Sequence, residues 1–105
     1  MLDLRRGTHP VAVVVSGRWQ ETAAIIAWES SDEPELDHYE VRAMAGDQYE
    51  SEDEVALACI SPEEPLHFST VFALDEPGAK AVFRVYVVLR SGHERGSQPV
   101  VVVRG

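Results

Sequence analysis

Apolar and polar residues alternate with a period of two along most of the chain, which is the spacing of a β-strand with one face in a core. The clearest example follows the turn at Pro77-Gly78, where proline fixes φ and glycine accepts a positive φ. The two faces of the strand after this turn are Ala81, Phe83, Val85 and Val87 on one side, and Val82, Arg84, Tyr86 and Val88 on the other. We expect a central strand whose first face lies in the core.

Six further short segments have strand character and are separated by turn and loop signals. They cover residues 11–16, 21–28, 38–45, 55–60, 67–74 and 100–103. We expect a turn at Gly17-Arg18 and an edge position for 55–60. No segment keeps the apolar spacing of a long helix. Short strands at regular spacing predict an all-β fold, an antiparallel β-sandwich or barrel of about seven strands.

The alternation also predicts which side chains point inward. In 21–28 both faces are apolar, which indicates a strand in the middle of a sheet. In 38–45 the outward set is expected to be His38, Glu40, Arg42 and Met44. The expected core residues of these strands and of 67–74 are Ala24, Ile26, Trp28, Tyr39, Val41, Ala43, Phe68, Val71, Phe72 and Leu74.

Composition places the chain among folded, acidic, single-domain proteins. Its 105 residues are 45% hydrophobic and 26% charged, with a net charge of −9. We expect one domain over 1–105, with 1–9 as an N-terminal arm. Nucleic acids and anionic membranes attract basic surfaces, so neither is an expected partner.

The N-terminal region gives no sign of membrane insertion. The apolar run 11–15 is far shorter than the roughly 20 residues of a membrane helix, and 1–15 lacks the length and cleavage site of a signal peptide. We expect either a cytoplasmic chain or a module of a longer protein, which includes a secreted or surface protein.

Several motifs in this order resemble a fibronectin type III domain. Trp28 ends the second strand, Leu36 precedes Tyr39-Glu40-Val41, and Pro77-Gly78 precedes Phe83 and Val85. Gly92 to Pro99 followed by four valines is similar to the closing hairpin of that family. The resemblance covers nearly the whole chain and implies an immunoglobulin-like sandwich without shared catalytic residues.

One position departs from the family pattern. Ala81 stands where fibronectin type III domains usually have a tyrosine, whose hydroxyl ties the strand to the turn before it. Such a buried hydrogen bond contributes on the order of 1 kcal/mol. Another contact replaces it here, or the protein does without it.

The chain carries no motif for catalysis or for a cofactor. The acidic segments 29–37 and 49–54 lack the glycine of a calcium loop, and the four histidines show no zinc spacing, so no metal is expected. No serine stands in a G-x-S-x-G elbow, and Cys59 has no histidine near it in sequence. We predict that the protein is not an enzyme. The apolar neighbours of Cys59, which is the single cysteine, predict a buried and inert thiol.

The outward face of the long strand is unusually apolar for a sheet that faces water. Exposed apolar surface with arginine and aromatic residues is typical of an interface; alternatively, the arginine stems cover this face. The loop 91–96 is a second candidate, against a plain solvated turn. The predicted binding residues are Arg42, Met44, Val82, Arg84, Tyr86, Val88, His93 and Arg95.

The sequence therefore predicts a non-catalytic protein-interaction or spacer module. Its expected partner is another protein, a neighbouring domain or a second copy, bound on the face of the third, sixth and seventh strands. The alternative is a small-ligand or carbohydrate-binding accessory module of a larger enzyme or surface protein. Trp19 is then the only obvious aromatic platform for a sugar.

Overall fold

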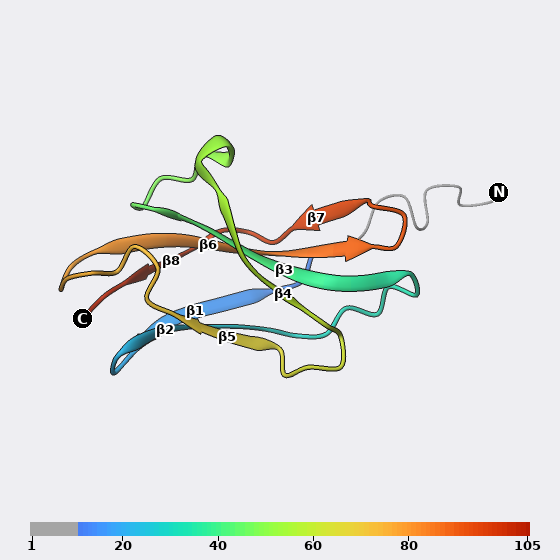
Figure 1. Ribbon diagram of the computed structural model, residues 1–105, viewed down its shortest axis with the longest axis horizontal. Coiled ribbons are helices and arrows are strands. Elements are labelled where there is room, and N and C mark those ends of the chain that lie inside the picture. Colours follow the sequence, from blue (N-terminus) through green and yellow to red (C-terminus); the bar gives the residue numbers. More distant parts are fainter. Residues whose placement is uncertain (1–10) are drawn as a thin grey trace.

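Two antiparallel sheets pack face to face in the computed structural model, which describes residues 11–105 (Figure 1). The smaller sheet has the order β1-β2-β5, with β1 at Val15–Gln20, β2 at Ala23–Trp28 and β5 at His67–Thr70. The predicted antiparallel β-sandwich is therefore confirmed. The expected arm 1–9, and His9 within it, lie outside the described residues.

The larger sheet has five strands. It begins with β4 (Val55–Ile60), continues through β3 (Leu36–Ala45) and reaches β6 (Lys80–Leu89). Two short strands, β7 (Glu94–Gly96) and β8 (Val100–Val103), both pair with β6. A 3₁₀ turn, Ser51–Asp53, lies in the β3–β4 connection. Within 11–105, no helix is both long and apolar enough to span a membrane.

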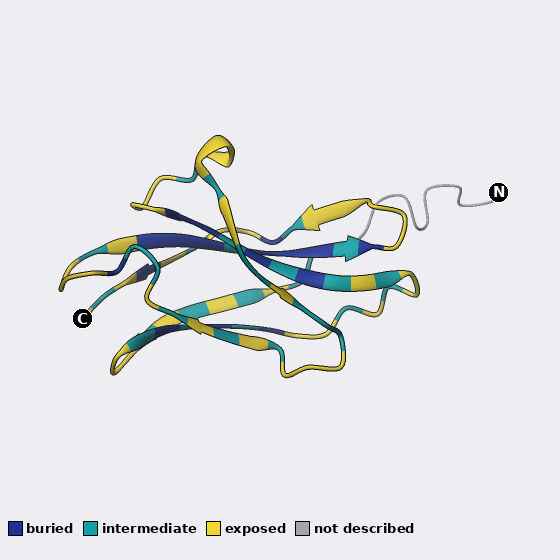
Figure 2. Ribbon diagram, in the orientation of Figure 1, coloured by how far each residue is buried: buried dark blue, intermediate teal, exposed yellow. Residues whose placement is uncertain are grey.

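The core forms between the inner faces of β2, β3 and β6, as the alternation predicts. Figure 2 shows the longest buried stretch along β6. The Trp28 ring meets the Tyr39 ring edge-on, with centroids 5.7 Å apart, a favoured aromatic geometry. The buried residues of these inner faces are Ala24, Ile26, Trp28, Tyr39, Val41, Ala43, Ala81, Phe83, Val85, Val87 and Leu89.

β7 and β8 are two halves of one edge, separated by a break at Ser97–Pro99. The pairing with β6 shifts by one position across the break. The buried Ser97 accepts the Val85 N–H on its Oγ (3.0 Å) and donates its own N–H to the Val85 carbonyl (2.9 Å). The serine side chain thus satisfies a core amide that a regular ladder would have paired.

The first strand starts later and runs further than expected. β1 begins at Val15 and passes straight through Gly17-Arg18, where a turn was expected. Gly17 serves the packing instead: a Cβ there would lie 3.0 to 3.1 Å from the side chains of Ile26, Val100 and Val102. The turn falls at Glu21-Thr22, and Glu21 adopts a φ of 57° that glycine more often supplies.

The expectation for 67–74 was also partly wrong. The strand stops at Thr70, and Val71 is 54% exposed rather than in the core. The chain turns here, since the Leu74 N–H donates to the Val71 carbonyl and Ala73 has a φ of 58°. Leu74 itself is fully buried, as expected.

Arg104 makes a contact like that of the missing corner tyrosine. Its Nη1 donates to the Leu74 carbonyl at 2.8 Å, which ties the end of the sheet to the turn before β6. Its backbone exchanges hydrogen bonds with Gly78 and Ala79. Ala81 is fully buried, so a small side chain packs where the tyrosine would be.

Substituting Arg104 with Met should destabilise the fold. It removes the bond to the Leu74 carbonyl and the guanidinium that lies 5.3 Å from the Trp19 ring centre. We expect a loss of about 1–2 kcal/mol in the free energy of unfolding, measured by urea titration. The matched control is Arg90→Met, because Arg90 is exposed and its nearest carboxylate oxygen, on Glu35, is 3.9 Å away. Equal losses in the two variants would contradict the role of Arg104.

Candidate functional site: the outer face of the larger sheet

Six of the eight predicted binding residues share the outer face of the larger sheet. β3 contributes Arg42 and Met44, and β6 contributes the other four. Arg42 pairs directly with Arg84, and Met44 pairs with Val82. Like charges directly opposite each other are unfavourable in a sheet, so each arginine needs its own set of acceptors. The remaining two predicted residues, His93 and Arg95, lie in and after the β6–β7 loop.

Arg42 lies across the face toward β7. Its guanidinium forms a two-bond pair with the Glu94 carboxylate at 2.9 and 3.0 Å, and its Nε donates to Glu40. The same guanidinium sits 3.8 Å from the centre of the Tyr86 ring, a cation–π contact. Arg42 thus links β3 to β7 over the ring of a β6 residue.

Arg84 is the centre of a second network. Its Nε donates to the Ser97 carbonyl at 2.7 Å, and its Nη1 donates to the hydroxyls of Tyr49 (2.6 Å) and Tyr86 (3.1 Å). The Tyr86 hydroxyl in turn donates to the Glu54 carboxylate at 2.8 Å. The chain of bonds fastens the β3–β4 connection onto the sheet.

The outer face is therefore not the exposed apolar surface that the sequence predicts. Met44, Val82 and Tyr86 are only 6%, 2% and 7% exposed. The connection 46–54 folds back over the sheet, where the Glu50 N–H approaches the Met44 sulfur at 3.0 Å. Because this connection and the arginine stems cover the face, a partner has little of its apolar surface to contact.

The electrostatics of this face favour fixed charges over proton transfer. Burial, hydrogen bonds with Tyr49 and Glu54 and the Glu54 charge raise the pKa of Tyr86, so its hydroxyl stays a donor. The Arg42 hydrogen bond lowers the pKa of Glu94. Partial burial lowers the pKa of Arg42, but the hydrogen bonds that it donates to Glu94 and Glu40, with the charges of these carboxylates, outweigh burial and raise this pKa. Each member of the pair is held in its charged form.

Gly96 leaves room for these side chains. A Cβ at this position would lie 2.6 Å from the Arg84 guanidinium and 2.8 Å from the Tyr86 ring. Both side chains therefore rest against the bare backbone of β7. Sequence reasoning assigned this glycine only to a turn.

His93 and Arg95 stay exposed beside the hairpin loop. The His93 Nδ1 lies 2.8 Å from the Ser91 hydroxyl, a contact within the turn. Arg95 lines a surface cavity of about 270 Å³ together with Gly96, Gln98 and the segment 12–15. Of the predicted binding residues, these two remain directly accessible to a partner.

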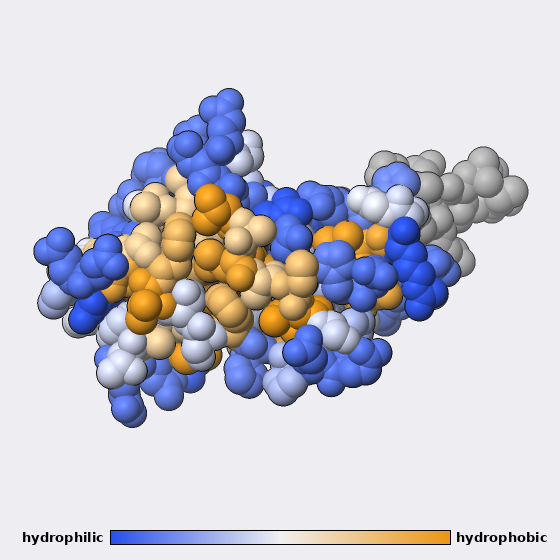
Figure 3. Space-filling view, in the orientation of Figure 1, coloured by the Kyte–Doolittle hydropathy of each residue, from blue (hydrophilic) through white to orange (hydrophobic). Residues whose placement is uncertain are grey.

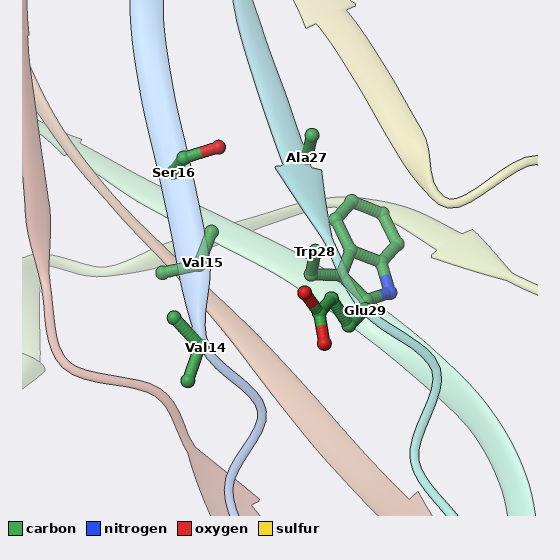
Figure 4. Close-up of a pocket in the computed structure, with 6 residues that line it drawn as sticks. All are labelled: Val14, Val15, Ser16, Ala27, Trp28 and Glu29. Atoms are coloured by element: carbon green, nitrogen blue, oxygen red, sulfur yellow. The ribbon is translucent and has the colours of Figure 1, made fainter.

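A second cavity of about 270 Å³ opens between the start of β1 and the end of β2 (Figure 4). Val14, Val15 and Ser16 line one side and Ala27, Trp28 and Glu29 the other. Glu29 contributes the only ionisable side chain to this lining. The cavity is a groove between strand ends, without the several convergent polar groups of a catalytic site.

Three side chains with metal-binding atoms meet at the β3–β4 side of the outer face. His38, Glu40 and Cys59 have donor atoms within 4.8 Å of one another. Sequence spacing missed this group because its members come from two strands. The expected burial of Cys59 is wrong, since the thiol side of β4 is exposed. Two effects raise the pKa of this thiol: the slight burial of Sγ and the negative charge of Glu40.

The chain resembles known proteins in structure and not in sequence. Neither the protein-family models nor the curated protein sequences contain a match. An Fn3-like protein from Clostridium thermocellum matches with a TM-score of 0.67 and 15% identity over 91% of this chain and 94% of that one. The FN5 domain of Drosophila Lar matches with a TM-score of 0.61 and 19% identity over 90% and 96% of the two chains. The fold is that of a fibronectin type III domain.

The same fibronectin type III fold is found within a larger enzyme. Pectate lyase PelI from Erwinia chrysanthemi matches with a TM-score of 0.70 and 18% identity. The match covers 87% of this chain but only 27% of the lyase. At these identities the likeness establishes the fold alone.

Substituting Arg84 with Met should loosen the β3–β4 connection. The variant leaves the Ser97 carbonyl and two tyrosine hydroxyls without their cationic donor. We expect a loss of about 2–3 kcal/mol in the free energy of unfolding, and faster amide exchange in 46–54. The control is Arg18→Met on the smaller sheet, where the arginine bonds only its neighbour Gln20 among the described residues. Unchanged exchange in 46–54 would contradict this role.

Proposed function

We propose that this domain is a non-catalytic protein-interaction module that accepts an extended segment of a partner as an added strand on β4. The observation that carries the proposal is the open and uncharged edge of β4. Among residues 11–105 this strand pairs with β3 only, and its sequence Val-Ala-Leu-Ala-Cys-Ile contains no charged residue. Natural edge strands usually carry charges that discourage pairing, so an uncharged open edge indicates a use for it.

The surface around this edge supports the proposal. Val55 is 44% exposed, and Ala56 and Cys59 are exposed as well. In Figure 1, β4 crosses in front of β3 and β6. Figure 3 shows the molecule from the same side, and apolar residues gather in the middle of this surface with polar residues around them. An apolar centre with a polar rim is typical of a protein interface.

Two features restrict what can pair with β4. The register with β3 shifts so that Leu57 has no partner, and this bulge limits the added strand to a short one. Acidic residues flank the strand on both sides, Glu52 to Glu54 before it and Glu63 and Glu64 after it. A partner segment with an apolar centre and basic flanks is therefore favoured. A second copy of this chain, with its net charge of −9, is opposed by repulsion.

The test uses a probe peptide with a short Val/Thr-alternating centre and two flanking lysines at each end. We expect fluorescence anisotropy to show binding that weakens with salt, and binding at least about tenfold weaker for the same peptide with glutamate flanks. Val55→Lys should abolish binding, because it places a like charge on the edge. Val101→Lys is the matched control, because Val101 is also 44% exposed but lies on β8.

Two outcomes would contradict strand addition on β4. One is an equal loss of binding in the Val55 and Val101 variants; the other is no binding of either peptide. Light scattering at low salt is expected to show a monomer. A stable dimer that Val55→Lys leaves intact would place self-association elsewhere on the molecule.

A second candidate, an accessory module of a polysaccharide-degrading enzyme, is favoured by one observation. The similar pectate lyases contain this fold as about a quarter of a longer chain, and one of them is in complex with tetragalacturonic acid. The present chain is acidic, which opposes an anionic sugar polymer. Trp19 is half-buried against the core with Arg104 over its ring, so it is no free platform. Quenching of tryptophan fluorescence by tetragalacturonate would favour this candidate over strand addition.

A further inference from the structure

We propose that His38, Glu40 and Cys59 form a binding site for a divalent transition metal, with zinc as the metal that best fits the ligands. Their donor atoms lie within 4.8 Å of one another on the surface of the larger sheet. Thiolate, imidazole and carboxylate are the three ligand types of protein zinc sites.

Strand pairing brings the three side chains together. His38 and Glu40 are two residues apart on β3, so they project from the same face of the sheet. Cys59 is the direct cross-strand partner of Glu40. Its Sγ lies 3.8 Å from Glu40 Oε2. The two ligands from β3 and the one from β4 thus rest on rigid backbone.

The spacing suits a tetrahedral ion after a small adjustment. Zinc bonds of about 2.0–2.3 Å place neighbouring tetrahedral ligand atoms about 3.5 Å apart. The three donors need to close by about 1 Å, which side-chain rotation supplies at this half-exposed position. With three protein ligands, the fourth position is left to water or to an external ligand, as in open zinc sites.

Neighbouring residues orient two of the ligands. The Asp37 carboxylate lies 2.7 Å from His38 Nδ1, which leaves Nε2 as the free donor atom. A carboxylate on the far side of a histidine is a usual support for a metal ligand. Arg42 bonds Glu40 through Oε1, so Oε2 faces the thiol and is open to the metal.

The local charge favours a cation. Glu40 is itself a charged ligand, and the carboxylates of Asp37 and Glu94 lie beside the ligands. Among the described residues, Arg42 is the one arginine or lysine that bonds to these carboxylates. Arg42 is already paired with Glu94 through two hydrogen bonds, which offsets its charge. Metal binding also converts the Cys59 thiol to thiolate, because the ion displaces its proton. The bound ion therefore meets a negative site.

The experiment is a Co²⁺ titration of the full chain at neutral pH with a phosphine reductant. We expect one ion per chain and a sulfur-to-cobalt charge-transfer band in the near ultraviolet, which Zn²⁺ then removes by displacement. Cys59→Ser should abolish the band. His38→Gln and Glu40→Gln should weaken Co²⁺ binding by more than about 100-fold, because loss of a direct ligand exceeds the cost of losing its support.

Matched variants separate the metal site from general effects. His67→Gln changes an exposed histidine on the other sheet and should leave Co²⁺ binding unchanged. Asp37→Asn should weaken binding by about 10–100-fold with the band retained. Thermal melts without metal check that each variant folds. Absence of the band in the unaltered chain, equal binding by the Cys59 variant, or one ion shared by two chains would overturn the proposal.

The metal-site proposal and the strand-addition proposal can be disproved independently of each other. The ligands use side chains on the outer face, whereas an added strand uses the backbone edge of β4 and the region of Val55. Peptide binding that is lost in Val55→Lys but kept in Cys59→Ser supports strand addition on β4. The cobalt titration then decides the metal site separately.

Discussion

The pairing of β3 with β6 is the constraint from which the rest of the molecule follows. Both strands are ten residues long, and after a shift between Leu36 and His38 they keep one register from His38 opposite Val88 to Ala45 opposite Ala81. Once that register is fixed, every alternate side chain is committed to the core or to the outer face, because a slip by one residue would exchange the two sets. The core and the arginine networks are thus opposite sides of one ladder.

The side chains on the outer face of the larger sheet pack into a second, thin layer. Arg42 and Arg84 are directly opposed, and the sheet tolerates them because each guanidinium reaches a different set of acceptors and a tyrosine ring. Each of these bonds adds only modestly to stability, because the arginines and their carboxylate partners are partly exposed, and the bonds act together. Their visible effect is to hold the β3–β4 connection on the sheet.

The sequence was a good guide wherever one residue's environment depends on its neighbours along a strand. The alternation in 38–45 and after Pro77-Gly78 identifies the inward residues correctly, because side-chain direction has a period of two. It failed where distant segments decide the outcome. Nothing in the polar segment 46–54 says that it folds over Met44 and Tyr86, so the burial of these two residues could not be foreseen.

The same limit applies to the turns and to the proposed metal ligands. The local sequence predicts a turn at Gly17. In the structure this glycine lies within β1, and the side chains of β8 pack against it. His38, Glu40 and Cys59 meet only in one register of β3 with β4, and the bulge at Leu57 sets that register. A spacing rule along one segment cannot contain this information.

The break at Ser97 leaves the larger sheet with one edge that is open to further strand pairing. On that side the edge is divided into β7 and β8, and β1 packs alongside β8. At the opposite side, β4 pairs with β3 alone among residues 11–105, and its ladder is interrupted at Leu57. Copies of this chain could therefore pair through one edge of the larger sheet and not through both, and a growing fibre needs a contact at both edges.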